Sequence, residues 1–125
     1  MEQYNIERIN IIINTVCNAY GTTFDQVNIN CRKQKYVEVR HAIAYFLKKI
    51  NPKITFDQIG KIFNPKKHHS TIIYSIKQYE NQIFLYPPQK KLAEKIHKTI
   101  EGNLSNIDTT DFLYLIDLQD TPPYF

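Results

Sequence analysis

The side chains best suited to chemistry in this 125-residue sequence gather in one short segment, residues 66–71. The segment reads Lys66, Lys67, His68, His69, Ser70 and Thr71. These side chains donate or accept hydrogen bonds, and such groups contact phosphates and base edges in nucleic-acid complexes. Adjacent helical residues point about 100° apart, so His68 and His69 would not bind one metal ion together. With no cysteine or acid close to them in sequence, we expect no metal site.

The sequence has none of the patterns that indicate catalysis. Its three isolated glycines cannot form a phosphate-binding loop. The two cysteines, Cys17 and Cys31, are too few for a disulfide framework or a zinc site. We therefore expect a non-enzymatic protein without a cofactor. A reduced, cytoplasmic protein is the default, because neither a signal peptide nor a membrane-spanning segment is visible.

The charge is unevenly distributed along the chain. The net charge is +4, but residues 32–98 contain 15 of the 16 Lys and Arg residues and only four acids, which makes this segment +11. Residues 103–125 contain four aspartates and no basic residue. A basic body favours a polyanionic partner such as DNA, although a lysine-rich solvated surface would give the same count.

Residues 55–79 predict the elements that would position the 66–71 segment. Thr55 and Gln58 form a capping-box pattern that opens a short helix over 56–63. A polar turn follows, and apolar spacing then predicts a longer helix over 69–85. This arrangement is typical of a helix-turn-helix, whose second helix places its first residues against DNA bases. An ordinary helical hairpin with polar capping residues would produce the same spacing.

The remaining pattern is also helical, and the fold class expected is all-α. Apolar spacing predicts helices over 4–20, 24–28, 36–50 and 87–102, with the first ended by Gly21 and the last ended near Gly102. We expect residues 1–102 to form the domain and residues 103–125 an acidic, apolar tail. The one stretch that could alternate as a strand is 112–116. The tail would pack on the 87–102 helix, pair with a second copy as a short strand, or bind a partner protein.

Three blocks of the sequence resemble the C-terminal DNA-binding domain, domain IV, of the bacterial replication initiator DnaA. The blocks are residues 40–44 (RHAIA), Ile59-Gly60 followed by Phe63, and residues 67–72 (KHHSTI), and the resemblance covers about residues 8–83. It implies a Trp-repressor-like helix-turn-helix fold that binds double-stranded DNA. The DNA-binding residues that it implies, together with the basic residues beside them, are Arg32, Lys33, Lys35, Arg40, Lys48, Lys66, Lys67, His68, His69, Ser70, Thr71 and Lys77.

The resemblance also implies individual roles. His69, Ser70 and Thr71 would lie at the major groove and the adjacent phosphates. Arg32, in the basic loop 32–35, would enter the minor groove. Lys48 would contact a phosphate from the long helix, and Lys77 would be a basic position on the recognition helix.

The sequence departs from the family pattern at the start of the recognition helix. His68 stands where the family has aspartate, and a neutral histidine cannot reproduce the way an acid reads the amino group of cytosine. Lys67 replaces an arginine, and the turn is one residue longer and contains Pro65. The initiator's ATPase module is not in this sequence. We therefore expect a free-standing relative, of the kind carried by phages or mobile elements or used as a small regulator.

Two functions follow as hypotheses. The first is a double-stranded DNA-binding protein that acts in replication or transcription regulation. The alternative is an adaptor or decoy that keeps the fold, has lost base-specific reading, and binds replication or transcription proteins, with the 103–125 tail as its contact. RNA binding has little support, because the sequence offers no aromatic stacking motif on a sheet.

Overall fold

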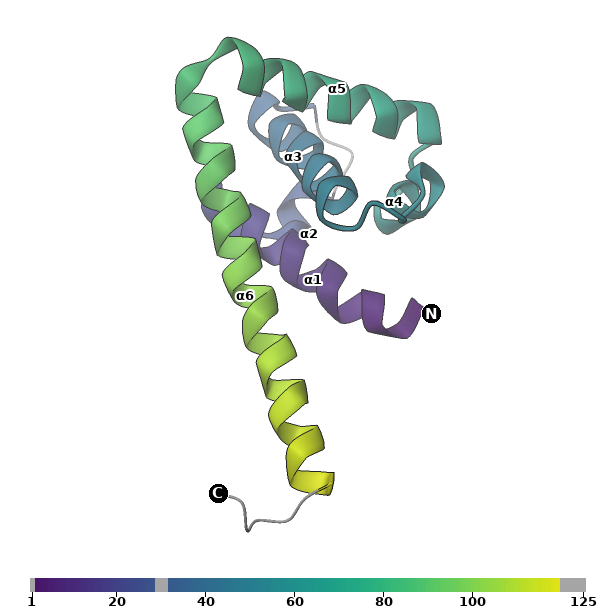
Figure 1. The fold of residues 1–125 in the computed structure, drawn as a ribbon. Helices are drawn as coiled ribbons and strands as arrows, with labels where there is room; N and C mark the ends of the chain where they lie inside the picture. Colours follow the sequence, from purple (N-terminus) through teal and green to yellow (C-terminus); the bar gives the residue numbers. More distant parts are fainter. Residues whose placement is uncertain (1, 29–31, 120–125) are drawn as a thin grey trace.

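The computed structural model describes residues 2–28 and 32–119, and the described residues form six helices and no strand (Figure 1). The all-α prediction is confirmed. The helices are α1 (Glu2–Ala19), α2 (Phe24–Val27), α3 (Gln34–Ile50), α4 (Phe56–Ile62), α5 (His69–Leu85) and α6 (Pro87–Gln119). No helix of the described residues combines the length and the apolar character that a bilayer crossing requires.

The core lies around α3, which packs against both α1 and α5, while α6 packs against α1 and α5 along one side of the bundle (Figure 1). Each of these helices presents apolar residues at intervals of three and four, so one face of each is buried. The fully buried large side chains are Ile12, Val16, Val27, Val39, Ile43, Phe46, Leu47, Ile59, Ile72, Tyr79, Ile96 and Ile100.

One buried polar cluster joins α1, α5 and α6. The hydroxyl of Tyr79 lies 2.9 Å from that of Tyr20, and the side-chain amide of Gln89 donates to the Tyr20 hydroxyl over 3.0 Å. Burial raises the pKa of Tyr79, so the phenol stays protonated. The cluster satisfies a polar group that would otherwise be costly inside the core.

The helix ends follow the predicted signals closely. Gly21 adopts a left-handed φ of 71° just after α1, a conformation that favours glycine. The capping box of α4 is complete: the Thr55 hydroxyl accepts from the backbone N–H of Gln58, and the Gln58 side chain accepts from the N–H of Thr55. At α2 only half of such a capping box forms. The Thr23 hydroxyl accepts from the backbone N–H of Gln26, but the Gln26 side chain accepts from the Thr22 hydroxyl.

The predicted helix end near Gly102 is wrong. Helix α6 continues through Gly102 to Gln119, and Figure 1 shows its second half extending beyond the bundle. A single glycine inside a helix lowers the stability of that helix by only about 1 kcal/mol relative to alanine. A glycine therefore ends a helix only where the chain also changes direction. The suggested strand over 112–116 is likewise wrong, because these residues are helical. The division into units at residue 102 stays a prediction.

The glycine that matters for the helix-turn-helix is Gly60. A Cβ atom there would overlap the carbonyl oxygen of Lys67, and the Lys67 N–H donates to the Gly60 carbonyl over 3.0 Å. The last turn of α4 therefore lies directly against the backbone that leads into α5. The close approach at Gly60 is thus made by the backbone that precedes α5.

We expect Gly60→Ala to destabilise the fold and Gly102→Ala to stabilise it. The added methyl group at residue 60 must displace backbone atoms, which costs about 1–3 kcal/mol of unfolding free energy. At residue 102 nothing lies within 4 Å of the added Cβ, so the gain in helix propensity of about 0.5–1 kcal/mol remains. Urea denaturation measures both changes. An unchanged midpoint for Gly60→Ala would show that α4 and the turn can separate without cost.

Candidate nucleic-acid interface

The predicted recognition helix begins where the sequence placed it. Helix α5 starts at His69, with His68 as its N-cap residue in an extended conformation. Ser70 and Thr71 are exposed in the first turn, while Ile72 on the opposite side is buried in the core. The first turn thus presents polar side chains to solvent, an arrangement that suits phosphate or base contacts.

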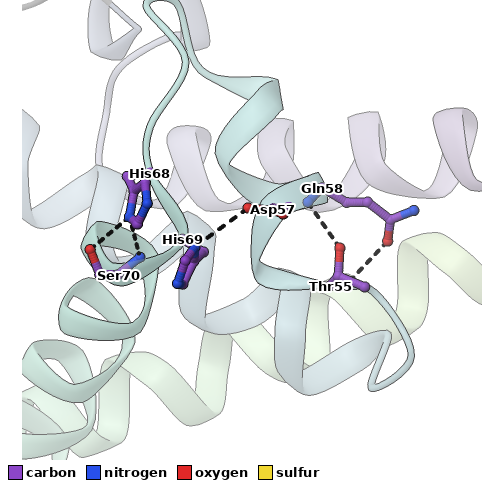
Figure 2. Close-up of polar contacts among 6 residues, drawn as sticks. All are labelled: Thr55, Asp57, Gln58, His68, His69 and Ser70. Carbon is purple, nitrogen blue, oxygen red and sulfur yellow. Dashed lines mark hydrogen bonds and ion pairs between the residues drawn. The ribbon is translucent and has the colours of Figure 1, made fainter.

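His68 caps the helix with its imidazole ring. Its Nδ1 atom accepts from the backbone N–H of Ser70 over 3.2 Å and lies 2.8 Å from the Ser70 hydroxyl oxygen (Figure 2). Because Nδ1 accepts from the backbone N–H, the proton of the neutral ring must be on Nε2. The exposed edge of His68 therefore carries a hydrogen-bond donor.

His69 links the first turn of α5 to α4. Its Nδ1 atom lies 3.7 Å from a carboxylate oxygen of Asp57, and its ring stacks on that of His68 at a centroid distance of 4.1 Å (Figure 2). Both members of the His69–Asp57 pair are more than half exposed, so the pair adds little stability. The contact orients His69 and brings one acid close to the first turn.

The structure ties the end of α2 to the turn of the helix-turn-helix. The backbone N–H of Asn64 donates to the side-chain oxygen of Asn28 over 2.7 Å, and the rings of Phe24 and Phe63 pack at a centroid distance of 6.1 Å. Residues 32–35 follow shortly after Asn28 and are all exposed. Neither asparagine was singled out from the sequence, because a contact between residues 36 positions apart leaves no local pattern.

Arg40 and Lys67 place two positive charges beside this junction. Arg40, half-buried on α3, donates to the carbonyl of Val27 at the end of α2 over 2.9 Å. Burial lowers the pKa of Lys67, and the charge of nearby Arg40 lowers it further. An anion bound there would relieve this repulsion. Arg40 therefore supports the loop from within, a structural role in addition to the DNA contact predicted for it.

Lys48 has a structural role that the sequence did not reveal. Its ammonium group donates to the carbonyls of Pro52 and Ile54, over 3.0 and 2.6 Å, and lies 4.8 Å from the centroid of the Phe56 ring. It thus holds the connection between α3 and α4. The phosphate contact that the resemblance implies for Lys48 stays a prediction.

The other predicted residues are exposed. Lys66 lies in the turn, and Lys77 lies two helical turns beyond the first turn of α5. The sequence did not identify Tyr74 as a candidate site residue. It is 58% exposed on α5, and its ring packs edge to face against the ring of His41. The i, i+4 and i, i+3 intervals from Ser70 to Tyr74 and from Tyr74 to Lys77 could have identified it as part of the same helix face.

The structure brings no metal-binding group together in the part of the chain that it describes. No set of three His, Cys, Asp or Glu side chains is placed to bind a metal ion there. Cys17 is buried on α1, and burial raises the pKa of its thiol to about 11, which makes it a poor nucleophile. Cys31 lies outside the described residues.

We expect His68→Ala to destabilise the protein and His69→Ala to have little effect. Removing the cap leaves the Ser70 N–H without its acceptor, and loss of an N-cap side chain costs about 0.5–2 kcal/mol. His69→Ala is the matched control, because it removes a neighbouring, equally exposed imidazole that makes no cap bond. Urea denaturation of both variants near neutral pH compares the two. Equal losses of stability would contradict the capping role.

Comparisons with known proteins agree with this geometry. A family model described as the bacterial DnaA protein helix-turn-helix matches residues 9–78. The chromosomal replication initiator protein DnaA of Oleidesulfovibrio alaskensis is 29% identical over 95 residues, which are 76% of this chain and 20% of that relative. The chain thus spans about a fifth of the length of this curated relative. No solved structure matches the chain. The match of residues 9–78 contains α4, the turn and the first turns of α5, and the chain belongs to the family of the bacterial DnaA helix-turn-helix domain.

Proposed function

We propose that this protein binds double-stranded DNA through α5 and the basic loop together. The first turn of α5, with His69, Ser70 and Thr71, enters the major groove, while Arg32 reaches the adjacent minor groove. The observation that carries the proposal is the bond between Asn64 and Asn28, because it joins the turn to the residue that follows α2, a few positions before the basic segment. Two elements held in this way can contact both grooves without an ordering cost at binding.

Electrostatics supports the same surface. Five exposed cations support it: Arg32 and Lys33 just before α3, Lys35 in its first turn, Lys66 in the turn before α5, and Lys77 on α5. Partly buried Lys67 adds another charge: burial lowers its pKa, and repulsion from Arg40, which a phosphate would relieve, lowers it further. Asp57 is the one acid in direct contact with the first turn, among the described residues, and it is paired with His69. The surface is therefore suited to phosphates over its whole length.

The cap made by His68 bears on which base the protein reads. In the family pattern this position is an aspartate, and an acid accepts a hydrogen bond from the amino group of cytosine. His68 uses Nδ1 for the cap and exposes the Nε2 proton, so it donates where the family residue accepts. We infer that the protein prefers a base acceptor, such as guanine O6 or N7, at this position.

The cellular process belongs to the proposal as well. The relative's printed name places it in chromosomal replication, and a protein that binds related sites would act in replication or transcription regulation. We assign it binding and no catalysis, and a cytoplasmic location, with protein partners reached through residues 103–125. The alternative function, an adaptor or decoy, is favoured by one observation: Phe84, Leu85 and Tyr86 are exposed at the corner between α5 and α6.

We expect binding to duplex DNA to be steeply dependent on salt. If about five phosphates are neutralised, the logarithm of the binding constant should fall with the logarithm of the salt concentration with a slope of about −4 to −5. Fluorescence anisotropy with a labelled duplex of random sequence measures this slope. Absence of binding at about 50 mM salt, where electrostatic contacts are strong, would rule out the DNA-binding proposal.

Two lysine variants form the control for this titration. Lys66→Ala removes a charge from the turn and should reduce the slope by about 1. Lys91→Ala removes an equally exposed charge from α6, which the proposal leaves outside the DNA surface, and should leave the slope unchanged.

We expect His68→Asp to change the base preference while keeping the protein folded, because aspartate is itself a good N-cap residue. The variant should select cytosine at one position where the unaltered protein does not, with a difference in binding free energy of about 1–3 kcal/mol. Binding-site selection from a random library, followed by sequencing, compares the two proteins. Identical preferences would show that residue 68 faces no base.

A further inference from the structure

Helix α6 has opposite charges on its two halves. Residues 87–102 contain four lysines and two glutamates, whereas residues 103–119 contain three aspartates, Asp108, Asp111 and Asp117, and no basic residue. The second half is also rich in apolar residues, with the sequence Phe112-Leu113-Tyr114-Leu115-Ile116 at its centre. A helix with this sequence would be a poor solitary extension into water, because apolar residues gain free energy by burial.

A cavity of about 430 Å³ lies beside the basic half of α6. Its apolar part is formed by Tyr45, Phe46, Ile83 and Ala93, from α3, α5 and α6. Its charged residues are Lys49, Lys90, Lys98, Glu94 and Glu101. A carboxylate oxygen of Glu101 lies 3.0 Å from Nε2 of His97. Three lysines therefore face one carboxylate, Glu94, that is not paired with His97. This excess of positive charge suits the cavity to an apolar segment that carries acidic groups.

One buried atom in this cavity lacks a partner. His97 Nδ1 is buried and has no hydrogen-bond partner among the described residues, while Nε2 of the same ring contacts Glu101. An unsatisfied buried polar atom typically costs about 1–3 kcal/mol. His97 is itself one of the residues that line the cavity, so a helix that covers the cavity would pack against this residue.

The acidic half of α6 cannot reach the cavity of its own chain. Both belong to one continuous helix of 33 residues, about 50 Å long, and a straight helix cannot fold back on itself. Figure 1 shows the second half leading away from the bundle in the direction set by the first half. The same constraint excludes packing of residues 103–119 on the 87–102 helix, which the sequence had left open.

We propose that α6 pairs antiparallel with α6 of a second copy of this chain. The acidic, apolar half of each copy lies over the cavity of the other, so that residues 90–101 of one copy face residues 108–119 of its partner. The interface is self-complementary about a twofold axis, as expected for a homodimer. A parallel pair would place like charges together, and only the antiparallel arrangement joins lysines to aspartates in both halves.

Charge reversal tests this pairing with variants that replace charged residues of α6. The basic-half variant carries Lys90→Glu and Lys98→Glu, and the acidic-half variant carries Asp108→Lys and Asp111→Lys. Sedimentation equilibrium over a range of concentrations gives the mass of each species, and circular dichroism checks that each variant remains helical. The unaltered chain is expected at twice its 14.8 kDa mass, and each variant alone at the single-chain mass.

Two rescues distinguish antiparallel pairing from other causes of association. An equimolar mixture of the two variants restores opposite charges at both ends of the pair and should sediment as a dimer. A variant with all four changes should also dimerise. A single-chain mass for the unaltered protein at every concentration, or a dimer that neither reversal weakens, would overturn the proposal. The experiment contains no DNA, so its outcome is separate from that of the DNA-binding proposal.

Discussion

The contact between the backbones of Gly60 and Lys67 is the constraint on which the candidate interface depends. The Lys67 N–H donates to the Gly60 carbonyl, and no side chain can occupy residue 60 without overlapping the Lys67 carbonyl. This contact holds the end of α4 against the residues that lead into α5. The direction of α5, and therefore of the polar side chains in its first turn, follows from it. A helix-turn-helix is rigid for this reason, although its turn contains no regular structure.

The turn also contacts a different part of the chain, the end of α2 that precedes the basic residues. The bond from Asn64 to Asn28 and the bond from Arg40 to Val27 hold this end in place. Each bond is worth only about 1 kcal/mol to stability, yet together they set the separation between the end of α2, the turn and α3. Specific recognition depends on such separations, because the two grooves of DNA lie at a set distance from each other.

His68 combines a structural role, the cap of α5, with the recognition role proposed for it. An aspartate at an N-cap position offers carboxylate oxygens to both the helix and a base. A neutral imidazole has one acceptor, and in this protein the cap uses it, so only a donor remains. A single substitution that preserves the fold can thereby invert the hydrogen-bonding character of one recognition position. Specificity within one fold family changes most easily at residues of this kind.

The sequence by itself determined the local features of this protein. The helices could be predicted from the spacing of apolar residues, from the Thr55–Gln58 capping box and from the prolines. The 66–71 segment showed where polar side chains would gather. All of these signals act over a few residues, so they can be recognised without the fold. Tertiary structure alone decided the features that depend on distant residues: the bond between Asn28 and Asn64, the use of Lys48 to hold a loop, and the uninterrupted course of α6 through Gly102. Local sequence determines which element each segment can form. The partner of a lysine, or whether a helix continues through a glycine, depends on the residues that the fold places beside it.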